Sequence, residues 1–112
     1  YYQAFEAIEA DPHQFLAVVE QAGRIVGTFQ LSFIPGMSLQ GAWRAQIEAV
    51  RIDHSLRNQG LGRVVMQWAI EQARQRGCTL VQLTTHKSRR DAHRFYQRLG
   101  FISSHEGMKL KL

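Results

Sequence analysis

Arg57-Asn58-Gln59-Gly60-Leu61-Gly62-Arg63 is the stretch that decides how this chain is expected to fold. It joins a strand-like run to a helix-like run, and its two glycines stand where the helix would begin. The first N–H groups of a helix have no intrahelical partner and carry partial positive charge, so main chain alone can bind phosphate oxygens there. Glycine lets that main chain approach its ligand, and the flanking arginines add charge. The stretch therefore indicates an anion-binding loop, although a plain strand-to-helix turn has the same composition.

The residues before this loop predict a short helix followed by three antiparallel strands. Apolar residues at near-helical spacing predict a helix over residues 1–10, which Asp11-Pro12 ends. Strands are expected at 15–20, 25–34 and 43–52, with a tight turn at 21–24 and a break at Pro35-Gly36. In the third strand, unbroken alternation would divide the side chains between two faces: Ala45, Ile47, Ala49 and Arg51 on one, and Arg44, Gln46, Glu48, Val50 and Ile52 on the other.

The residues after the loop predict a helix, a strand and a second helix. The first helix is expected to end at Gly77 and to bury Leu61, Val64, Val65, Trp68, Ala69, Gln72 and Ala73. A compact buried strand is expected at 79–84, and the second helix is expected to be capped by Asp91 and ended by Gly100. A strand-helix-strand order puts the loop at the carboxyl end of its strand, where open sheets bind ligands. Two short strands, at 101–103 and 108–112, would complete the chain.

Composition limits the class of protein. With 112 residues, 45% of them apolar, the chain is long enough for one folded domain; we expect neither a signal peptide nor a membrane span, since no apolar run is long enough to cross a bilayer. The net charge of +5 favours anionic partners, but few aromatic residues accompany the basic ones for base stacking. The single cysteine, Cys78, fits a reducing cytoplasm. No histidine has metal-ligand spacing, so no metal is expected.

Two motifs, in order, carry a resemblance to a known family: Arg57-x-x-Gly60-x-Gly62 and Ala92-x-x-Phe95-Tyr96-x-x-Leu99-Gly100-Phe101. They resemble the pyrophosphate-binding signature and the A-x-x-(F/L)-Y-x-x-x-G-F segment of the GNAT superfamily of acetyl-CoA-dependent N-acetyltransferases, over about residues 44–112. The resemblance implies an α/β fold: a mixed, mainly antiparallel sheet with flanking helices, splayed between strands 43–52 and 79–84. Acetyl-CoA would lie in that opening. Family members begin with a strand and a helix ahead of segment 1–10, so residues 1–112 are expected to form one GNAT domain that lacks both.

The resemblance also implies which residues hold the co-substrate. Backbone groups of the third strand would pair with pantetheine, loop amides would hold the pyrophosphate, and the second helix would contribute its start and its aromatic pair. Many members have an asparagine in the loop before that helix, where this chain has Ser88 and Arg89 instead. The cofactor-binding residues expected in this way are Val50, Arg51, Ile52, Arg57, Asn58, Gln59, Gly60, Leu61, Gly62, Arg63, Ser88, Arg89, Phe95 and Tyr96.

Two side chains are candidates for the catalytic chemistry. Acyl transfer from a thioester to an amine needs a neutral amine, a stabilised oxyanion and a proton for the departing thiolate. Tyr96 stands where the family keeps its acid, and the alternative is a core aromatic residue beside Phe95. Glu48 is the candidate base, directly or through water, because alternation places it with Val50 and Ile52; the alternative is a solvated carboxylate. A histidine, His86 or His93, also stays open as the base.

The sequence therefore predicts an N-acetyltransferase that transfers the acetyl group of acetyl-CoA directly to a primary amine of a small molecule or peptide. The expected partners are acetyl-CoA and the amine, without nucleic acid, membrane or metal, in the cytoplasm. A homodimer through strand 108–112 stays open. The alternatives are a non-catalytic acyl-CoA sensor on the same fold and a basic nucleic-acid-binding domain. The identity of the acceptor cannot be read from these residues.

Overall fold

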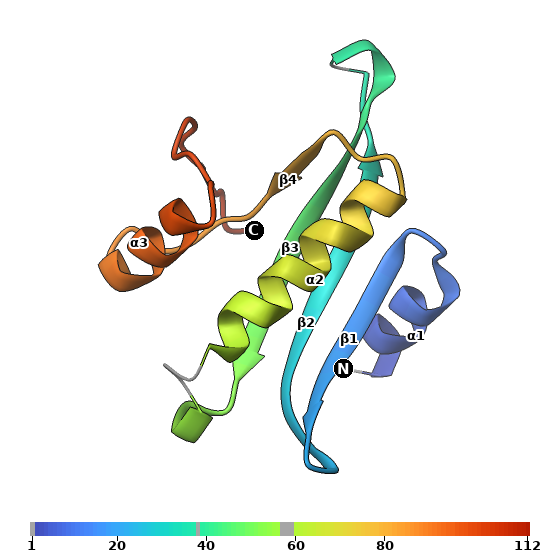
Figure 1. Ribbon diagram of the computed structural model, residues 1–112. Coiled ribbons are helices and arrows are strands. Elements are labelled where there is room, and N and C mark those ends of the chain that lie inside the picture. Colours follow the sequence, from blue (N-terminus) through green and yellow to red (C-terminus); the bar gives the residue numbers. More distant parts are fainter. Residues whose placement is uncertain (1, 38, 57–59) are drawn as a thin grey trace.

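The computed structural model describes residues 2–37, 39–56 and 60–112 (Figure 1). The helices and strands follow the predicted order as far as residue 100. None of the described helices is long and apolar enough to cross a lipid bilayer. The elements are α1 Tyr2–Ala10, β1 Gln14–Gln21, β2 Arg24–Pro35, β3 Trp43–Ile52, α2 Leu61–Gln75, β4 Leu80–Gln82 and α3 Arg90–Arg98, with 3-10 turns η1 Leu39–Gly41 and η2 His54–Leu56.

The sheet is open and mixed, with the strand order β1-β2-β3-β4. The first three strands are antiparallel neighbours, whereas β4 runs parallel to β3, as the strand-helix-strand order predicts. The parallel pairing is short: it joins Arg44 to Leu80, Ala45 to Val81 and Gln46 to Gln82, while β3 itself continues to Ile52. Beyond β4 the chain runs off toward α3 (Figure 1). The predicted opening between these two strands is therefore confirmed.

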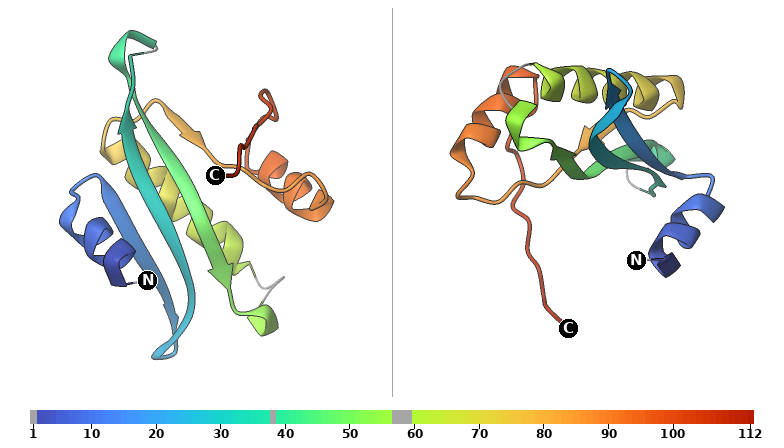
Figure 2. Two further views of the ribbon diagram at one scale, coloured as in Figure 1. Left: turned by 180° about the vertical axis from the view of Figure 1, so that it is seen from behind. Right: turned by 90° about the horizontal axis from the view of Figure 1, so that it is seen from below.

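Helix α2 lies across one face of the sheet (Figure 2). Its apolar stripe follows the helical repeat and packs on inward-facing strand residues. Met66 is 1% exposed whereas Val64 is 60% exposed, so the predicted inner position at 64 is wrong. The stripe that faces the sheet is centred one residue further along the helix than the sequence suggested. The core consists of Ala17, Phe29, Leu31, Phe33, Ala45, Ile47, Val65, Met66, Ala69 and Ala73.

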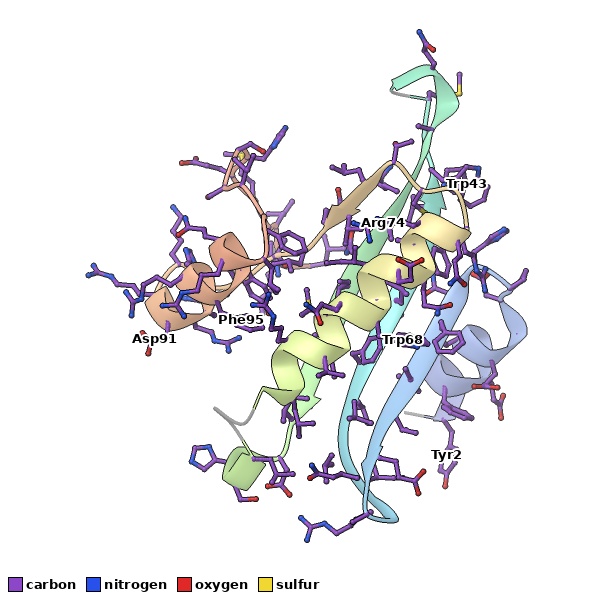
Figure 3. All side chains as sticks on the ribbon, viewed as in Figure 1. Tyr2, Trp43, Trp68, Arg74, Asp91 and Phe95 are labelled. Carbon is purple, nitrogen blue, oxygen red and sulfur yellow. The ribbon has the colours of Figure 1, made fainter. Side chains whose placement is uncertain are left out.

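Trp68 stands at the margin of this core rather than inside it. Its indole is 41% exposed and lies 5.7 Å from the Phe15 ring and 5.8 Å from the Phe29 ring, measured between centroids. Figure 3 shows it between α2 and β1. The tryptophan thus closes the side of the core that lies nearest β1.

Three expectations for the C-terminal part are wrong. Strand β4 covers only residues 80–82, and its Leu80 is 46% exposed, so it is neither as long nor as buried as predicted. No strand forms over residues 101–112, although the apolar residues Met108, Leu110 and Leu112 alternate with lysines. A strand needs a neighbour for its backbone hydrogen bonds, and this segment runs away from the sheet (Figure 2).

The third correction concerns the start of α3. The helix begins at Arg90, with Arg89 at the N-cap position and no side-chain cap among the described residues. Asp91 therefore lies inside the first turn, where it pairs with Arg94 one turn further on. Its negative charge still favours a helix start, through the helix dipole rather than through a capping hydrogen bond.

Candidate active site

The described part of the predicted anion-binding loop, residues 60–63, lies at the start of α2. Gly60 is the N-cap residue with φ 81° and ψ 0°, a left-handed conformation that glycine adopts without strain. Its carbonyl accepts the first intrahelical bond from the Val64 N–H, at 3.2 Å. Among the described residues no side chain caps this end, so the N–H groups of Leu61, Gly62 and Arg63 form its first turn. The predicted residues Arg57, Asn58 and Gln59 lie outside the described ranges.

The two sequence motifs meet in space at Gly62. A β-carbon built on this glycine would lie 3.4 Å from Cζ of Phe95, which belongs to the second motif. Figure 3 shows Phe95 on the side of α3 that faces α2. The first turn of α2 therefore lies next to the aromatic ring of α3, at a distance that a β-carbon would bring to van der Waals contact. Residues more than thirty positions apart in the sequence are brought together in this way.

Tyr96 lies in an aromatic cluster on the inner side of α3. Its ring meets Phe95 edge-on at 5.3 Å and Phe101 edge-on at 5.9 Å. It is half-buried and packs against the core together with both neighbours. Edge-to-face packing fixes the position of the ring, and therefore the line along which the phenol oxygen projects.

Ser88 and Arg89 lie at the start of α3, in a surface hollow of about 390 Å³ lined by residues 88–92. The Ser88 backbone N–H donates to His86 Nδ1 at 3.2 Å, and the Ser88 hydroxyl lies 2.8 Å from the same nitrogen. The ring Nε2 of His93 lies 3.1 Å from the His86 carbonyl oxygen. Both histidines named as alternative bases therefore contribute to the order of this turn.

A β-bulge in β3 corrects the prediction for Glu48. Thr28 pairs with Arg51 but Gln30 pairs with Glu48, so one extra residue of β3 is accommodated there, and Ala49 has φ 53°. Val50 and Ile52 consequently pack against the core, on the side of Ala45 and Ile47. Glu48 does not share their face, contrary to the prediction from unbroken alternation. It points away from α2, as Arg44, Gln46 and Arg51 do.

The sequence contained a signal for this bulge. An unbroken alternation would have placed Arg51 on the buried face, with Ala45 and Ile47. A charged residue at an inward position is costly, and the adjacent Ala49-Val50 pair marks the point where the apolar pattern changes phase. The observed exposure of Arg51 and partial burial of Ile52 agree with the shifted pattern.

Glu48 is the end of a chain of hydrogen bonds that sequence reasoning missed. The Gln46 side-chain amide donates to Glu48 Oε1 at 2.9 Å, and the Gln82 amide donates to Gln46 Oε1 at 2.8 Å. Glu48 is exposed, while both glutamines are half-buried. Parallel strands place paired residues on one face of a sheet, so the Gln46–Gln82 pairing could not be found without the register of β4.

Another missed residue is Thr85, between β4 and α3. Its hydroxyl oxygen is buried and has no hydrogen-bond partner among the described residues. A buried polar atom without a partner costs free energy. This hydroxyl follows β4, which separates from β3 beyond Gln82. It could accept a hydrogen bond from a bound molecule or donate one to it.

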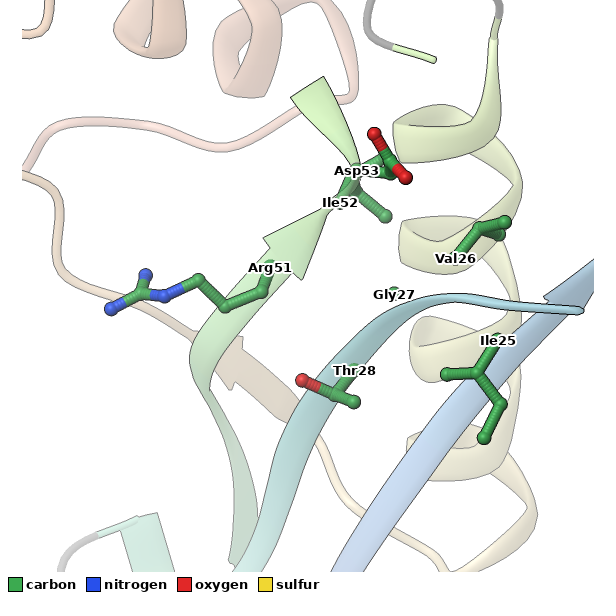
Figure 4. A pocket seen from close by; sticks show the side chains of 7 residues that line it. All are labelled: Ile25, Val26, Gly27, Thr28, Arg51, Ile52 and Asp53. Atoms are coloured by element: carbon green, nitrogen blue, oxygen red, sulfur yellow. The ribbon is translucent and has the colours of Figure 1, made fainter. Parts of the chain in front are cut away.

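An open hollow of about 280 Å³ lies where β2 begins and β3 ends (Figure 4). It is lined by Ile25, Val26, Gly27, Thr28, Arg51, Ile52 and Asp53. Gly27 is required here, because a β-carbon at this position would lie 2.7 Å from the Arg51 carbonyl oxygen. In Figure 4, Arg51 and Ile52 point in opposite directions, as expected for residues just beyond the bulge.

Asp53 fixes the chain where it leaves β3. The Ser55 hydroxyl and backbone N–H donate to its carboxylate at 2.8 and 3.0 Å, and Arg24 pairs with it at 3.1 Å. The two Ser55 hydrogen bonds, with the nearby Arg24 guanidinium, hold the pKa of Asp53 below its usual value. The Arg24–Asp53 ion pair thereby holds the segment that follows β3 against the start of β2.

The remaining reactive groups in the described ranges do not form a second catalytic or metal-binding site. Partial burial raises the pKa of the Cys78 thiol, although Arg76 opposes the shift. A thiol with a raised pKa is a poor nucleophile. Across the part of the chain that the structure describes, no cluster of histidine, cysteine and carboxylate side chains could hold a metal ion.

The strands of this open α/β sheet part beside the start of α2, where no described side chain caps the helix, and this arrangement is typical of proteins that bind phosphate-bearing molecules. The model of the acetyltransferase (GNAT) family matches residues 1–101, and the chain belongs to this family. The protein is accordingly an acyltransferase, and its family uses acetyl-CoA as co-substrate. The predicted family and fold are both confirmed.

Similar proteins agree with this assignment. The aminoalkylphosphonate N-acetyltransferase of Salmonella typhimurium is 37% identical over 109 residues, which cover 93% of this chain and 70% of that protein. The glucosamine 6-phosphate N-acetyltransferase of Trypanosoma brucei brucei is 34% identical over 93 residues, or 83% of this chain and 61% of that protein. A crystal structure of a transcriptional regulator from Bacillus halodurans has a TM-score of 0.96 and 48% identity, and it covers 100% of this chain and 75% of that one.

Proposed function

We propose that this protein transfers the acetyl group of acetyl-CoA directly to a primary amine of a small molecule, within a ternary complex. The observation that carries the proposal is the proximity of Gly62 to the Phe95 ring, because it brings the two family motifs together beside the sheet that opens beyond the β3–β4 pairing. An amine at a peptide N-terminus is the other acceptor that the family resemblance allows.

Several groups of this chain fit acetyl-CoA. The first-turn N–H groups of α2, from Leu61 to Arg63, suit the pyrophosphate, since Gly60 has no side chain and no other described side chain caps that end. The backbone of Val50, Arg51 and Ile52, beyond the last rung shared with β4, suits the pantetheine amides. The Thr85 hydroxyl, which has no partner in the described part of the chain, and the α3 hollow with Ser88 and Arg89 provide further polar groups.

Acetyl-CoA supplies an activated thioester, and the chain's own residues would manage the protons. Glu48 takes one proton from the ammonium group of the acceptor, so that the neutral nitrogen attacks the carbonyl carbon while the carbon–sulfur bond breaks. A backbone N–H of the Val50–Ile52 segment faces the carbonyl oxygen as it gains charge. Tyr96 donates its proton to the departing thiolate, and the second proton of the nitrogen restores the phenol. The products are an amide, free CoA and one proton on Glu48.

The charges on the exposed face of β3 suggest an acceptor with two ends. Glu48 lies there between Arg44 and Arg51, so an ammonium group can approach the carboxylate while an oxyanion meets a guanidinium. The named substrates of the Salmonella and Trypanosoma relatives both join an amine to a phosphorus oxyanion. We therefore propose an acceptor that carries a phosphonate or phosphate group.

Release of free thiol from acetyl-CoA tests this function. The acceptors are matched pairs that differ in the phosphorus group: 2-aminoethylphosphonate with ethanolamine, and glucosamine 6-phosphate with glucosamine. We expect kcat/KM at least about tenfold higher for the phosphorus-bearing member of a pair. Equal rates within both pairs would exclude the acceptor class, and no thiol release with these amines, polyamines or peptide N-termini would exclude the transfer itself.

The role of Tyr96 has its own test. Tyr96→Phe keeps the ring in its aromatic cluster and removes only the hydroxyl. We expect kcat to fall about a hundredfold, with acetyl-CoA affinity changed less than about twofold. An unchanged kcat would remove Tyr96 from the mechanism and leave it as a packing residue.

The proposed pyrophosphate-binding site at the start of α2 can be tested at the two glycines that flank this helix. Gly60 and Gly77 flank α2, have φ 81° and 79°, and have nothing within 4 Å of an added β-carbon. Gly60→Asp and Gly77→Asp therefore impose the same backbone strain and the same charge at opposite ends. We expect only Gly60→Asp to weaken CoA binding in calorimetry, by about tenfold or more. Equal losses of CoA affinity in the two variants would refute a pyrophosphate-binding site at the start of α2.

A regulatory role is the second candidate, because the Bacillus halodurans protein with 48% identity is described as a transcriptional regulator. DNA binding by this chain would be steeply salt-dependent, since its net charge is +5. Gel shifts on duplex DNA, with and without CoA, measure this DNA binding.

We propose a cytoplasmic location, which the unpaired Cys78 suits.

A further inference from the structure

The side chains of Gln82, Gln46 and Glu48 form one directional chain of hydrogen bonds, named here the glutamine relay. Its direction is fixed by chemistry: a carboxylate only accepts, so the Gln46 atom that faces Glu48 must be the amide nitrogen. The Gln46 carbonyl oxygen is then left to accept from Gln82. Both bonds in the relay point toward Glu48, and Gln46, the donor to Glu48, is itself held by Gln82.

The position of the relay in the sheet is equally specific. Gln46 and Gln82 form the last rung of the β3–β4 pairing, and Glu48 is the next residue of that face of β3, already beyond the rung. The relay therefore connects the closed part of the sheet to a carboxylate in the opened part. No α2 residue is involved, because Ala45 and Ile47 occupy the other face.

A second group of polar side chains on the same face is independent of the relay. Gln14 Oε1 accepts from the Gln30 amide at 3.0 Å and from the Ser32 hydroxyl at 2.7 Å. Gln30 lies opposite Glu48 in the β2–β3 register but donates to Gln14. The face thus contains a glutamine that contacts Glu48 and a neighbouring glutamine that is bonded elsewhere, which provides a matched control.

We propose that Gln46 is a positioning residue for Glu48, and that Gln82 acts only by holding Gln46. This inference rests on the proposed function of Glu48 as the base. Glu48 is exposed, and without its partner the side chain would sample several rotamers, only some of which reach the acceptor nitrogen. Proton removal should then slow while acetyl-CoA binding, at the start of α2, stays intact.

The test uses methionine, which is as long as glutamine but cannot donate these hydrogen bonds. We expect Gln46→Met to lower kcat for 2-aminoethylphosphonate about tenfold and Gln82→Met about threefold, with the acetyl-CoA KM within about twofold. The double variant should match Gln46→Met, because Gln82 acts through Gln46. Gln30→Met, on the same face, should keep kcat within about twofold, and thermal unfolding checks that all variants fold.

The decisive experiment adds Gln46→Met to a Glu48→Gln variant. There Gln46→Met should cause no further loss of kcat, since no base remains to be oriented. A further loss, or additive effects of Gln46→Met and Gln82→Met, would overturn the relay. A large effect of Glu48→Gln with none of Gln46→Met would also overturn it and leave the proposed function standing. A Glu48→Gln variant as active as the wild type would instead overturn Glu48 as the base.

Discussion

The two faces of the sheet are built from alternate residues of the same strands, yet they differ in almost every respect. The face under α2 is apolar, and its residues Leu31, Phe33, Ala45 and Ile47 are between 0% and 4% exposed. The opposite face has polar side chains that bond to one another across the strands: Gln14, Gln30, Ser32, Gln46, Glu48 and Gln82. Burial of apolar area stabilises the fold on one side, and hydrogen bonds orient groups on the other.

The contrast teaches that stability and chemistry can be changed separately at adjacent positions. Ile47 and Glu48 are neighbours in sequence but belong to different faces, as do Leu31 and Gln30. A substitution on the α2 face should change the unfolding equilibrium and leave kcat per folded molecule alone. A substitution at Glu48 should do the reverse.

The largest expected effect is that of Glu48→Gln, which removes the charge and keeps the shape. We expect kcat to fall at least about a hundredfold, because general-base catalysis contributes about 10²–10⁴-fold. The melting temperature should change little, since Glu48 is exposed. Thiol release and thermal unfolding measure the two quantities. Ile47→Ala is the paired control: it should unfold more easily but keep its kcat, and a loss of kcat there would break the separation of the faces.

Leu31→Ala tests the other face. Leu31 is fully buried, so we expect the free energy of unfolding in urea to fall by about 2–5 kcal/mol. The control is Gln30→Ala, one residue earlier, with an expected loss of about 1 kcal/mol or less. Similar losses for both variants would show that the polar face contributes to stability as much as the core does.

Gly27→Ala tests the crowded end of the β2–β3 pairing, just beyond the bulge. The added carbon would lie 2.7 Å from the Arg51 carbonyl oxygen and 2.9 Å from Ile52 Cδ1, so the strands must shift apart. Overpacking of this kind costs about 1–3 kcal/mol in urea unfolding. Gly107→Ala, with nothing within 4 Å of its added carbon, should be near neutral. Equal stabilities of the two variants would contradict the close approach of these strands.

The smallest effect concerns Asp53, at the exposed end of β3. Its pKa is lowered in the folded state, so its stabilising contribution is present above the unfolded pKa of about 4 and is lost as the pH falls through the folded value. We expect Asp53→Asn to melt slightly below the wild type at about pH 7, and the difference to vanish below about pH 3. A difference that persists in acid would mean that the charge of Asp53 is not its cause.

Much of the fold could be predicted because periodicity and breakers agree with it. The bounds of β3 match the prediction at both ends, and α2 lies between Gly60 and Gly77, two glycines whose left-handed backbone glycine adopts without strain. Family membership followed from two local motifs, which the fold then brings close together at Gly62 and Phe95. These features depend on local sequence, which a single chain reveals.

The rest depended on contacts between distant residues. The face of Glu48 was predicted wrongly because a bulge at an alanine leaves only a phase change in the apolar pattern. The Gln46–Gln82 bond needs the register of a strand of three residues. The alternation at Met108, Leu110 and Leu112 suggested a strand, but alternation records only which side chains could share a face, and a strand also needs a neighbour.

The extra residue at Ala49 also determines how this strand tolerates insertions and deletions. If Ala49 were deleted, Ile47, Val50 and Ile52 would still point inward and Glu48 and Arg51 outward, because the shortened strand alternates without interruption. Deletion of a neighbouring strand residue outside the bulge would reverse every side chain beyond it. The packing therefore does not require residue 49, and its expected contribution is geometric: the bend that parts β3 from β4. Insertion of one residue into a strand is thus a simple change by which a flat sheet could acquire such an opening.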